Sequence, residues 1–169
     1  MNMRTKGGYF LGGQFNSVDI FGYASKGIPG IEILGIGKHG RMIKEKFVYL
    51  SREKKIKFPC KRFVLCIEGD LENKKFKEEE FRYLELPLLI MLWSLSGELP
   101  VSNLDDCFSI GKISVIGEIS SFELKEELQI KLWENLIHFE EKKFKIIAPN
   151  KAIIHELFYH ISTEELLPL

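Results

Sequence analysis

The fold is decided by the stretch Leu84-Glu85-Leu86-Pro87-Leu88-Leu89-Ile90-Met91-Leu92-Trp93-Ser94-Leu95-Ser96-Gly97-Glu98-Leu99-Pro100. Pro87 suits the first turn of a helix, where its missing N–H would have no partner, and Gly97 followed by Pro100 predicts the helix end. The residues between them are apolar on every face, so the rest of the protein must cover this helix on all sides. A membrane span needs about 20 apolar residues, roughly twice this run. We therefore predict a buried core helix.

Length and composition indicate one globular domain. The chain has 169 residues, of which 45% are hydrophobic and 28% are charged, and a chain of this size can bury about two-thirds of its unfolded surface. The charged start, Met1–Gly8, is followed by no apolar run, so we expect neither a signal peptide nor a membrane anchor, and the default compartment is the cytoplasm. Cys60, Cys66 and Cys107 match no zinc or disulfide spacing and are expected to be buried free thiols.

The formal net charge of zero hides an asymmetry along the chain. Residues 1–62 hold 13 Lys and Arg against 4 Asp and Glu, whereas residues 63–169 hold 11 against 20. A basic face could follow the phosphates of a nucleic acid, although a solvated helix end and loop would have the same composition. We take the densest basic run as the candidate contact surface for nucleic acid or a partner protein. Its residues are Arg52, Lys54, Lys55, Lys57, Lys61 and Arg62.

The segments around the core helix predict strands mixed with helices. Strands are expected at 16–24, 31–34, 63–67, 108–119 and 144–149, and helices at 41–53, 125–139 and 151–159. The turn Gly27-Ile28-Pro29-Gly30 predicts that the first two strands form a hairpin. We therefore expect an α+β fold of two layers, in which helices cover a mixed sheet. The domain would span residues 14–169, after a flexible N-terminal segment 1–13.

One glycine motif has the local context of a nucleotide site. Gly35, Gly37 and Gly40 spell G-x-G-x-x-G between a predicted strand and a predicted helix. A dinucleotide site also needs an acidic residue about 20 positions further on, whereas Glu68 and Asp70 follow Gly40 by 28 and 30 positions. A hairpin strand would also not pair in parallel with the next strand, as such a site requires. These features make cofactor binding here the weaker interpretation.

Other motifs lack the spacing that their chemistry needs. No G-x-x-x-x-G-K-[ST] sequence is present, so an ATPase would have to be a separate chain. His155 and His160 are five residues apart on a predicted helix, which turns the second imidazole away from the first, and no metal site is expected. Ser94 and Ser96 lie in or beside the core helix, and no histidine is near them in the sequence.

The core helix and its surroundings resemble the N-terminal domain of the magnesium-chelatase-like family, which includes the competence protein ComM and proteins like the chelatase subunit ChlI. Residues 84–100 resemble the family segment F-D-L-P-I-A-L-x-L-L-x-x-S-G-x-L-P. Four further segments fall in the family's order: 27–35 (G-L-P-x-F-x-I-V-G-L), 58–62 (F-P-x-x-R-I), 116–119 (V-G-E-L) and the proline-ended strand 144–149. The resemblance covers about residues 14–155 and does not include the family's AAA+ ATPase module.

This resemblance implies the ribosomal protein S5 domain 2-like fold, which the proteolytic domain of Lon proteases shares. Lon uses a serine and a lysine. At the serine position this chain has Glu85, and the lysine position falls on Leu132. Lys131 is one residue away, which turns it by about 100° on a helix. A carboxylate cannot replace the attacking hydroxyl, so no catalytic residue is expected, and Glu85 would instead complement the helix dipole.

The residues and the resemblance together predict a non-catalytic, ComM-like interaction or assembly module. The expected partners are a AAA+ ATPase in trans, DNA bound through the basic N-terminal part, and a second copy of the chain. No cofactor, metal or membrane contact is expected. The alternative belongs to another class: a nucleotide- or phosphate-binding enzyme that uses the Gly35–Gly40 loop.

Overall fold

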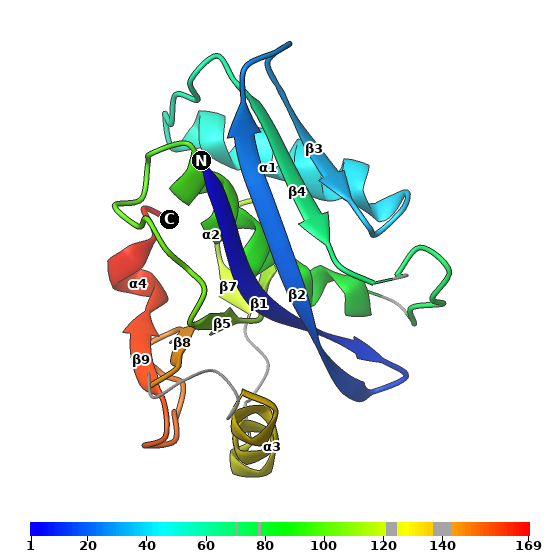
Figure 1. Ribbon diagram of the computed structural model, residues 1–169, viewed down its shortest axis with the longest axis vertical. Helices are drawn as coiled ribbons and strands as arrows, with labels where there is room; N and C mark the ends of the chain where they lie inside the picture. Colours follow the sequence, from blue (N-terminus) through cyan, green and yellow to red (C-terminus); the bar gives the residue numbers. More distant parts are fainter. Residues whose placement is uncertain (70, 78, 121–124, 137–142) are drawn as a thin grey trace.

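The computed structural model of the protein describes residues 1–69, 71–77, 79–120, 125–136 and 143–169, and its fold is α+β (Figure 1). Within them, a seven-stranded mixed sheet has the order β3-β4-β2-β1-β5-β8-β9, and β6 pairs with β7. The strands are β1 (Asn2–Leu11), β2 (Gln14–Ser25), β3 (Gly30–Leu34), β4 (Arg62–Ile67), β5 (Cys107–Ser109), β6 (Lys112–Ile113), β7 (Ile119–Ser120), β8 (Lys145–Ala148) and β9 (Tyr159–Ser162). The helices are α1 (His39–Glu53), the 3-10 helix η1 (Glu80–Leu84), α2 (Glu85–Leu95), α3 (Glu126–Leu136) and α4 (Thr163–Leu166).

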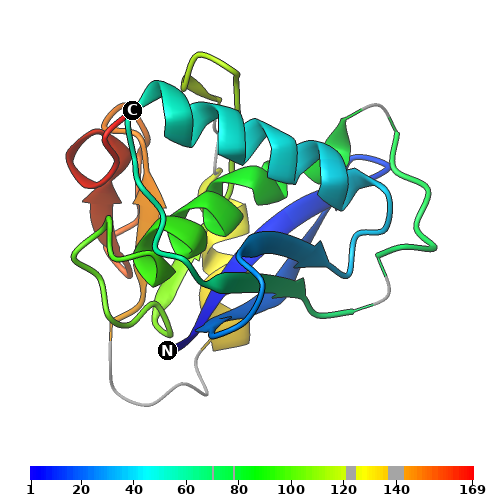
Figure 2. The same ribbon diagram turned by 90° about the horizontal axis from the view of Figure 1, so that it is seen from above.

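Helix α2 is the centre of the hydrophobic core. It lies directly against β1, β2 and β4, and α1 lies on its other side (Figure 2). All 11 residues of α2 are buried, which confirms the predicted core helix. Within the described ranges no helix is long and apolar enough to cross a membrane.

The predicted end of the core helix is also confirmed. Gly97 has a φ of +86°, and its N–H donates to the Ser94 carbonyl at 3.2 Å. The N–H of Glu98 donates to the Trp93 carbonyl at 3.0 Å. This pair of bonds is a Schellman motif, which satisfies the last carbonyls of a helix. The motif needs a residue with positive φ directly after the helix. Glycine takes that conformation at no steric cost.

The N-terminal segment is part of the sheet, contrary to the expectation for residues 1–13. β1 pairs antiparallel with β2 over its whole length, and β1 also pairs in parallel with β5. Gly12 and Gly13, with φ of +60° and +81°, form the turn of this hairpin. Their N–H groups donate to the Glu80 carboxylate at 3.2 and 3.0 Å. The Gly-Gly pair is a hairpin signal. It was not used in the prediction because the segment before it is charged and rich in glycine.

The predicted hairpin of residues 16–34 is wrong. β4 lies between the two expected partners: it pairs antiparallel with β2 and in parallel with β3. The apolar residues of β4 are more completely buried between two strands than at an edge. The segments β3, α1 and β4 therefore form a parallel strand-helix-strand unit, with the Gly35–Gly40 loop at the start of the helix.

The second half of the chain departs from the prediction at two places. The expected strand 108–119 is divided into β5, β6 and β7, because Gly111 bonds to the backbone of Tyr83 and Leu86 instead of to a strand. The expected helix 151–159 is wrong: residues 151–158 form turns and irregular backbone, and Tyr159 begins β9.

A polar side chain from α3 explains the missing helix. The Gln129 amide donates to the Ile153 carbonyl at 2.8 Å and accepts from the His155 N–H at 2.6 Å. These bonds satisfy backbone groups that a helix would have paired within itself. The expected helix 125–139 is present as α3 through Leu136, and residues 137–139 lie outside the described residues.

Gly35→Ala should destabilise the protein strongly. Gly35 has a φ of +94°, and a Cβ there would stand 2.2 Å from the carbonyl oxygen of Ile67. Backbone strain alone costs about 1–3 kcal/mol, and the clash adds to it, so we expect urea unfolding to show a loss above about 3 kcal/mol. Gly69→Ala is the matched control, because Gly69 has a φ of +110° but a Cβ there would meet no described atom within 4 Å. Equal losses in the two variants would contradict the close approach.

Candidate functional site

Most of the predicted basic run lies on one exposed part of the surface. It covers the C-terminal end of α1 and the loop that leads to β4, at the end of the sheet drawn at the top of Figure 1. Five of the six predicted residues are exposed there: Arg52, Lys54, Lys55, Lys57 and Lys61. Within the described part of the chain, none of the five makes an ion pair.

Arg62, the sixth predicted residue, has a different role. It begins β4, and its guanidinium donates to both carboxylate oxygens of Glu32 on β3, at 2.9 and 3.0 Å. The hydrogen bond from Arg62 lowers the pKa of the Glu32 carboxyl, so the pair is fully charged at neutral pH. Because its charge is matched by a fixed partner, Arg62 is less available to an external anion than the other five cations of the run.

Lys55 stands where a glycine would be expected. It follows the last turn of α1 with a φ of +57°. The Lys55 N–H donates to the Arg52 carbonyl at 3.0 Å, and the Ile56 N–H donates to the Ser51 carbonyl at 2.8 Å. This is the same Schellman geometry that Gly97 provides in α2. A side chain in this conformation costs about 1–3 kcal/mol, and such strain is found preferentially at functional sites.

The loop between β2 and β3 extends the basic surface. The Gly30 N–H donates to the Lys61 carbonyl at 3.2 Å, and Gly30 pairs with Arg62 at the start of β4. Lys26 in this loop is exposed and adds a sixth cation that the sequence did not connect with the run. We call this surface the basic end. It consists of Lys26, Arg52, Lys54, Lys55, Lys57 and Lys61.

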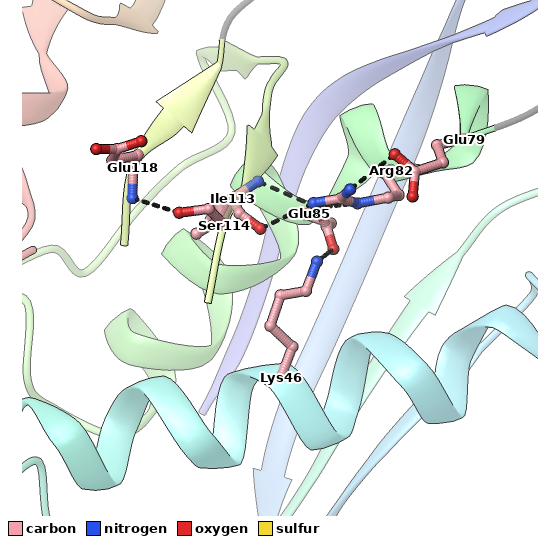
Figure 3. Close-up of polar contacts among 7 residues, drawn as sticks. All are labelled: Lys46, Glu79, Arg82, Glu85, Ile113, Ser114 and Glu118. Carbon is pink, nitrogen blue, oxygen red and sulfur yellow. Dashed lines mark hydrogen bonds and ion pairs between the residues drawn. The ribbon is translucent and has the colours of Figure 1, made fainter. Parts of the chain in front are cut away.

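Glu85 lies in a buried ion cluster at the start of α2 (Figure 3). Its side chain is 1% exposed and forms an ion pair with Lys46 of α1. The same carboxylate accepts from Arg82 Nε at 3.0 Å and from the Ile113 N–H at 3.1 Å. Arg82 in turn donates to Glu79 at 2.8 Å. The cluster therefore joins α1, η1, α2 and β6 around one carboxylate.

This cluster joins structural elements to one another, and the Glu85 side chain, 1% exposed, is shielded from solvent. Two cations and a backbone N–H occupy the Glu85 oxygens, and charges of both signs are matched. Leu132, the residue at the expected lysine position, packs in a separate hydrophobic cluster with Phe108 and Phe144. The structure therefore does not bring Glu85 and Leu132 together. Lys46, which the sequence did not single out, is the lysine beside Glu85.

The Gly35–Gly40 loop is shaped mainly by close packing. A Cβ at Gly40 would stand 2.8 Å from the Ile33 carbonyl oxygen, and a Cβ at Gly35 would stand only 2.2 Å from the Ile67 carbonyl oxygen of β4. Gly37, with a φ of +61°, faces the side chain of Glu72. The ring of His39, within this loop, stacks on the ring of Phe81, with 3.9 Å between the ring centroids. Burial lowers the pKa of His39, so the imidazole is uncharged at neutral pH. An acidic neighbour and a neutral histidine do not favour a phosphate at this loop.

The remaining candidate nucleophiles and ligands are separated or buried. Ser94 Oγ is buried and has no hydrogen-bond partner within the described residues, and Ser96 Oγ donates to the Trp93 carbonyl at 2.9 Å. The three cysteines are free; Cys107 is buried, and burial raises its pKa to about 12, whereas Cys60 is exposed, contrary to the expectation. No group of three or more metal-ligating side chains occurs among the residues that the structure describes.

The sheet face opposite α2 carries a shallow groove that the sequence did not predict. Arg4, Phe21 and Asp105 line it, from β1, β2 and the loop before β5. Arg4 pairs with Asp105, and Lys6 beside it pairs with Asp19. Because the cations of this groove are matched by carboxylates, it has no excess positive charge for a polyanion. The groove was not predicted because β1, one of the strands that line it, was not predicted.

In comparisons with known proteins, no protein-family model matches this chain, and no curated protein is significantly similar to it.

Glu85→Leu should destabilise the protein by about 3–5 kcal/mol, because it leaves Lys46 and Arg82 without their buried counter-charge. Urea unfolding measures this loss. Glu79→Gln is the control: Glu79 also pairs with Arg82, but its side chain is 57% exposed, and exposed pairs contribute up to about 1 kcal/mol. A Glu85→Leu variant as stable as the parent would show that the cluster does not hold the start of α2.

Proposed function

We propose that this protein is a non-catalytic interaction module that binds nucleic acid, DNA in the first instance, through the basic end. The observation that carries the proposal is the set of six exposed cations on two adjoining loops and a helix end, none of which has an ion-pair partner within the described residues. Unmatched cations on one surface are the electrostatic footprint of a phosphate-binding protein.

The backbone at Lys55 supports a functional interpretation of this charge. A glycine there would relieve the strain of a φ of +57°. The lysine side chain therefore costs stability at a position where it makes no ion pair within the described residues. Contact with an external anion would explain this arrangement, whereas a surface kept charged for solubility alone would not need a lysine in a strained conformation.

The resemblance to the magnesium-chelatase-like family agrees with this proposal. The five matching segments lie at the turn before β3, before β4, on α2, at the turn between β6 and β7, and on β8 with the proline that follows. These are element boundaries and the core helix, which determine a fold. We extend the proposal accordingly: the domain has an S5 domain 2-like fold, and it works with a AAA+ ATPase supplied by another chain.

The second candidate is a nucleotide- or phosphate-binding enzyme that uses the Gly35–Gly40 loop. The parallel pairing of β3 with β4 favours it, because a glycine motif between such a strand and a helix is the arrangement of dinucleotide sites. Glu72 beside Gly37 and the position of β3 at the edge of the described sheet count against it. NAD or ATP would then raise the melting temperature, and Gly37→Val would abolish that shift.

Binding of duplex DNA should weaken steeply as salt rises. If the basic end contacts five or six phosphates, the slope of log K against log salt is about −5 in fluorescence anisotropy titrations between about 50 and 200 mM salt. Lys55→Gly should make this slope less steep by about 0.9 and, by removing strain, raise the free energy of unfolding by up to about 1 kcal/mol.

A variant that folds better and binds worse separates recognition from stability. Lys131→Gln on α3 is the control, because Lys131 is exposed but lies outside the basic end. The affinity of this variant for DNA should equal that of the parent protein. Salt-independent binding, or equal affinity of Lys55→Gly and the parent, would refute the proposal.

A further inference from the structure

The loop at the basic end has an apolar tip. Ile28 is 88% exposed, among the most exposed large hydrophobic side chains in the described residues, and it belongs to neither hydrophobic cluster. Its neighbours Gly27, Pro29 and Gly30 are exposed as well. The fold therefore gains nothing evident from an isoleucine at this position.

The loop that carries this tip is anchored at both ends. Ser25 on β2 and Gly30 on β3 both pair with Arg62 of β4, and the Gly30 N–H donates to the Lys61 carbonyl at 3.2 Å. Arg62 is fixed in turn by its two bonds to Glu32. Pro29 restricts the backbone beside Ile28. Little conformational freedom would be lost if the tip entered a ligand, which favours binding by preorganisation.

The charges around the tip indicate the kind of ligand. Lys26 precedes Ile28 by two residues. Lys61, in the loop before β4, accepts a hydrogen bond from Gly30 at the other end of the loop that carries Ile28. Cations beside an exposed apolar side chain suit either duplex DNA or an anionic lipid surface. Stable attachment to lipid needs far more apolar area than one isoleucine, since even a myristoyl chain anchors a protein only marginally. A base step in DNA, by contrast, admits a single side chain between two phosphate backbones that the lysines can neutralise.

Resting on the proposed function, we infer that Ile28 is an apolar wedge: when the basic end binds the phosphates of duplex DNA, Ile28 inserts between base pairs and bends the duplex. Wedges of this kind, including isoleucine and proline, kink DNA by about 20–90°. The cations then supply most of the affinity, and Ile28 supplies the deformation. The protein would accordingly prefer flexible pyrimidine–purine steps and mismatched or gapped sites, which are easier to unstack.

The test measures bending separately from affinity. A short duplex that carries a donor and an acceptor dye at its two ends reports bending as increased energy transfer, and anisotropy of the same duplex reports affinity. The parent protein should bend the duplex. Ile28→Ser should keep the salt slope of binding but lose the increase in energy transfer, and Ile28→Met should retain it.

Ile153→Ser is the matched control, because Ile153 is also 88% exposed but lies outside the basic end; it should bend DNA like the parent. If Ile28→Ser binds and bends DNA as the parent does, the wedge is refuted and the proposed function stands. If the parent shows no salt-dependent DNA binding, both fail. The third outcome has two parts: the parent binds phosphatidylserine vesicles but does not bend DNA, and Ile28→Ser abolishes the vesicle binding. In that case the tip is a lipid contact and the inference is refuted.

Discussion

The whole structure depends on one constraint, which is that α2 must be shielded from water on every face. Its 11 residues are all buried, and the parts of the chain that bury it come from far apart: strands from the first 67 residues, α1, η1 and the short strand β6. Trp93 at the far end donates to Ser51 of α1 at 3.0 Å, so even the polar atom of its largest side chain is satisfied inside. A helix of this kind can exist only when the rest of the domain is assembled around it.

The same constraint explains why the start of α2 carries an ion cluster. Glu85 is drawn into the core with the first turn, and a buried carboxylate needs counter-charges and hydrogen bonds. Lys46, Arg82 and the Ile113 N–H provide them. Once all three are engaged, this position serves to join elements. The groups that remain available to other molecules are at the surface, and the cations of the basic end are a concentrated set of them.

The sequence predicted features that depend on neighbouring residues and missed those that depend on distant ones. The apolar run of α2 with its Gly97 stop is a local pattern and was predicted correctly. The basic run after α1 is also a local pattern, and five of its six residues are exposed. The insertion of β4 between β2 and β3 is a choice among strand partners, which no local pattern determines. The pairing of Arg62 with Glu32 and of Lys46 with Glu85 spans 30 and 39 residues. Gln129 likewise replaced a predicted helix at 151–159 through contacts that no periodicity reveals.

Native-state hydrogen exchange, read by mass spectrometry on fragments that cover residues 86–95, tests the central claim most directly. If the domain is assembled around α2, its amides should exchange only through global unfolding, so that their exchange free energy equals the free energy of unfolding from urea titration and falls with urea at the same slope. Exchange of these amides at a much lower free energy, while β2 and β4 stay protected, would show that the sheet stands without α2 and would contradict this account.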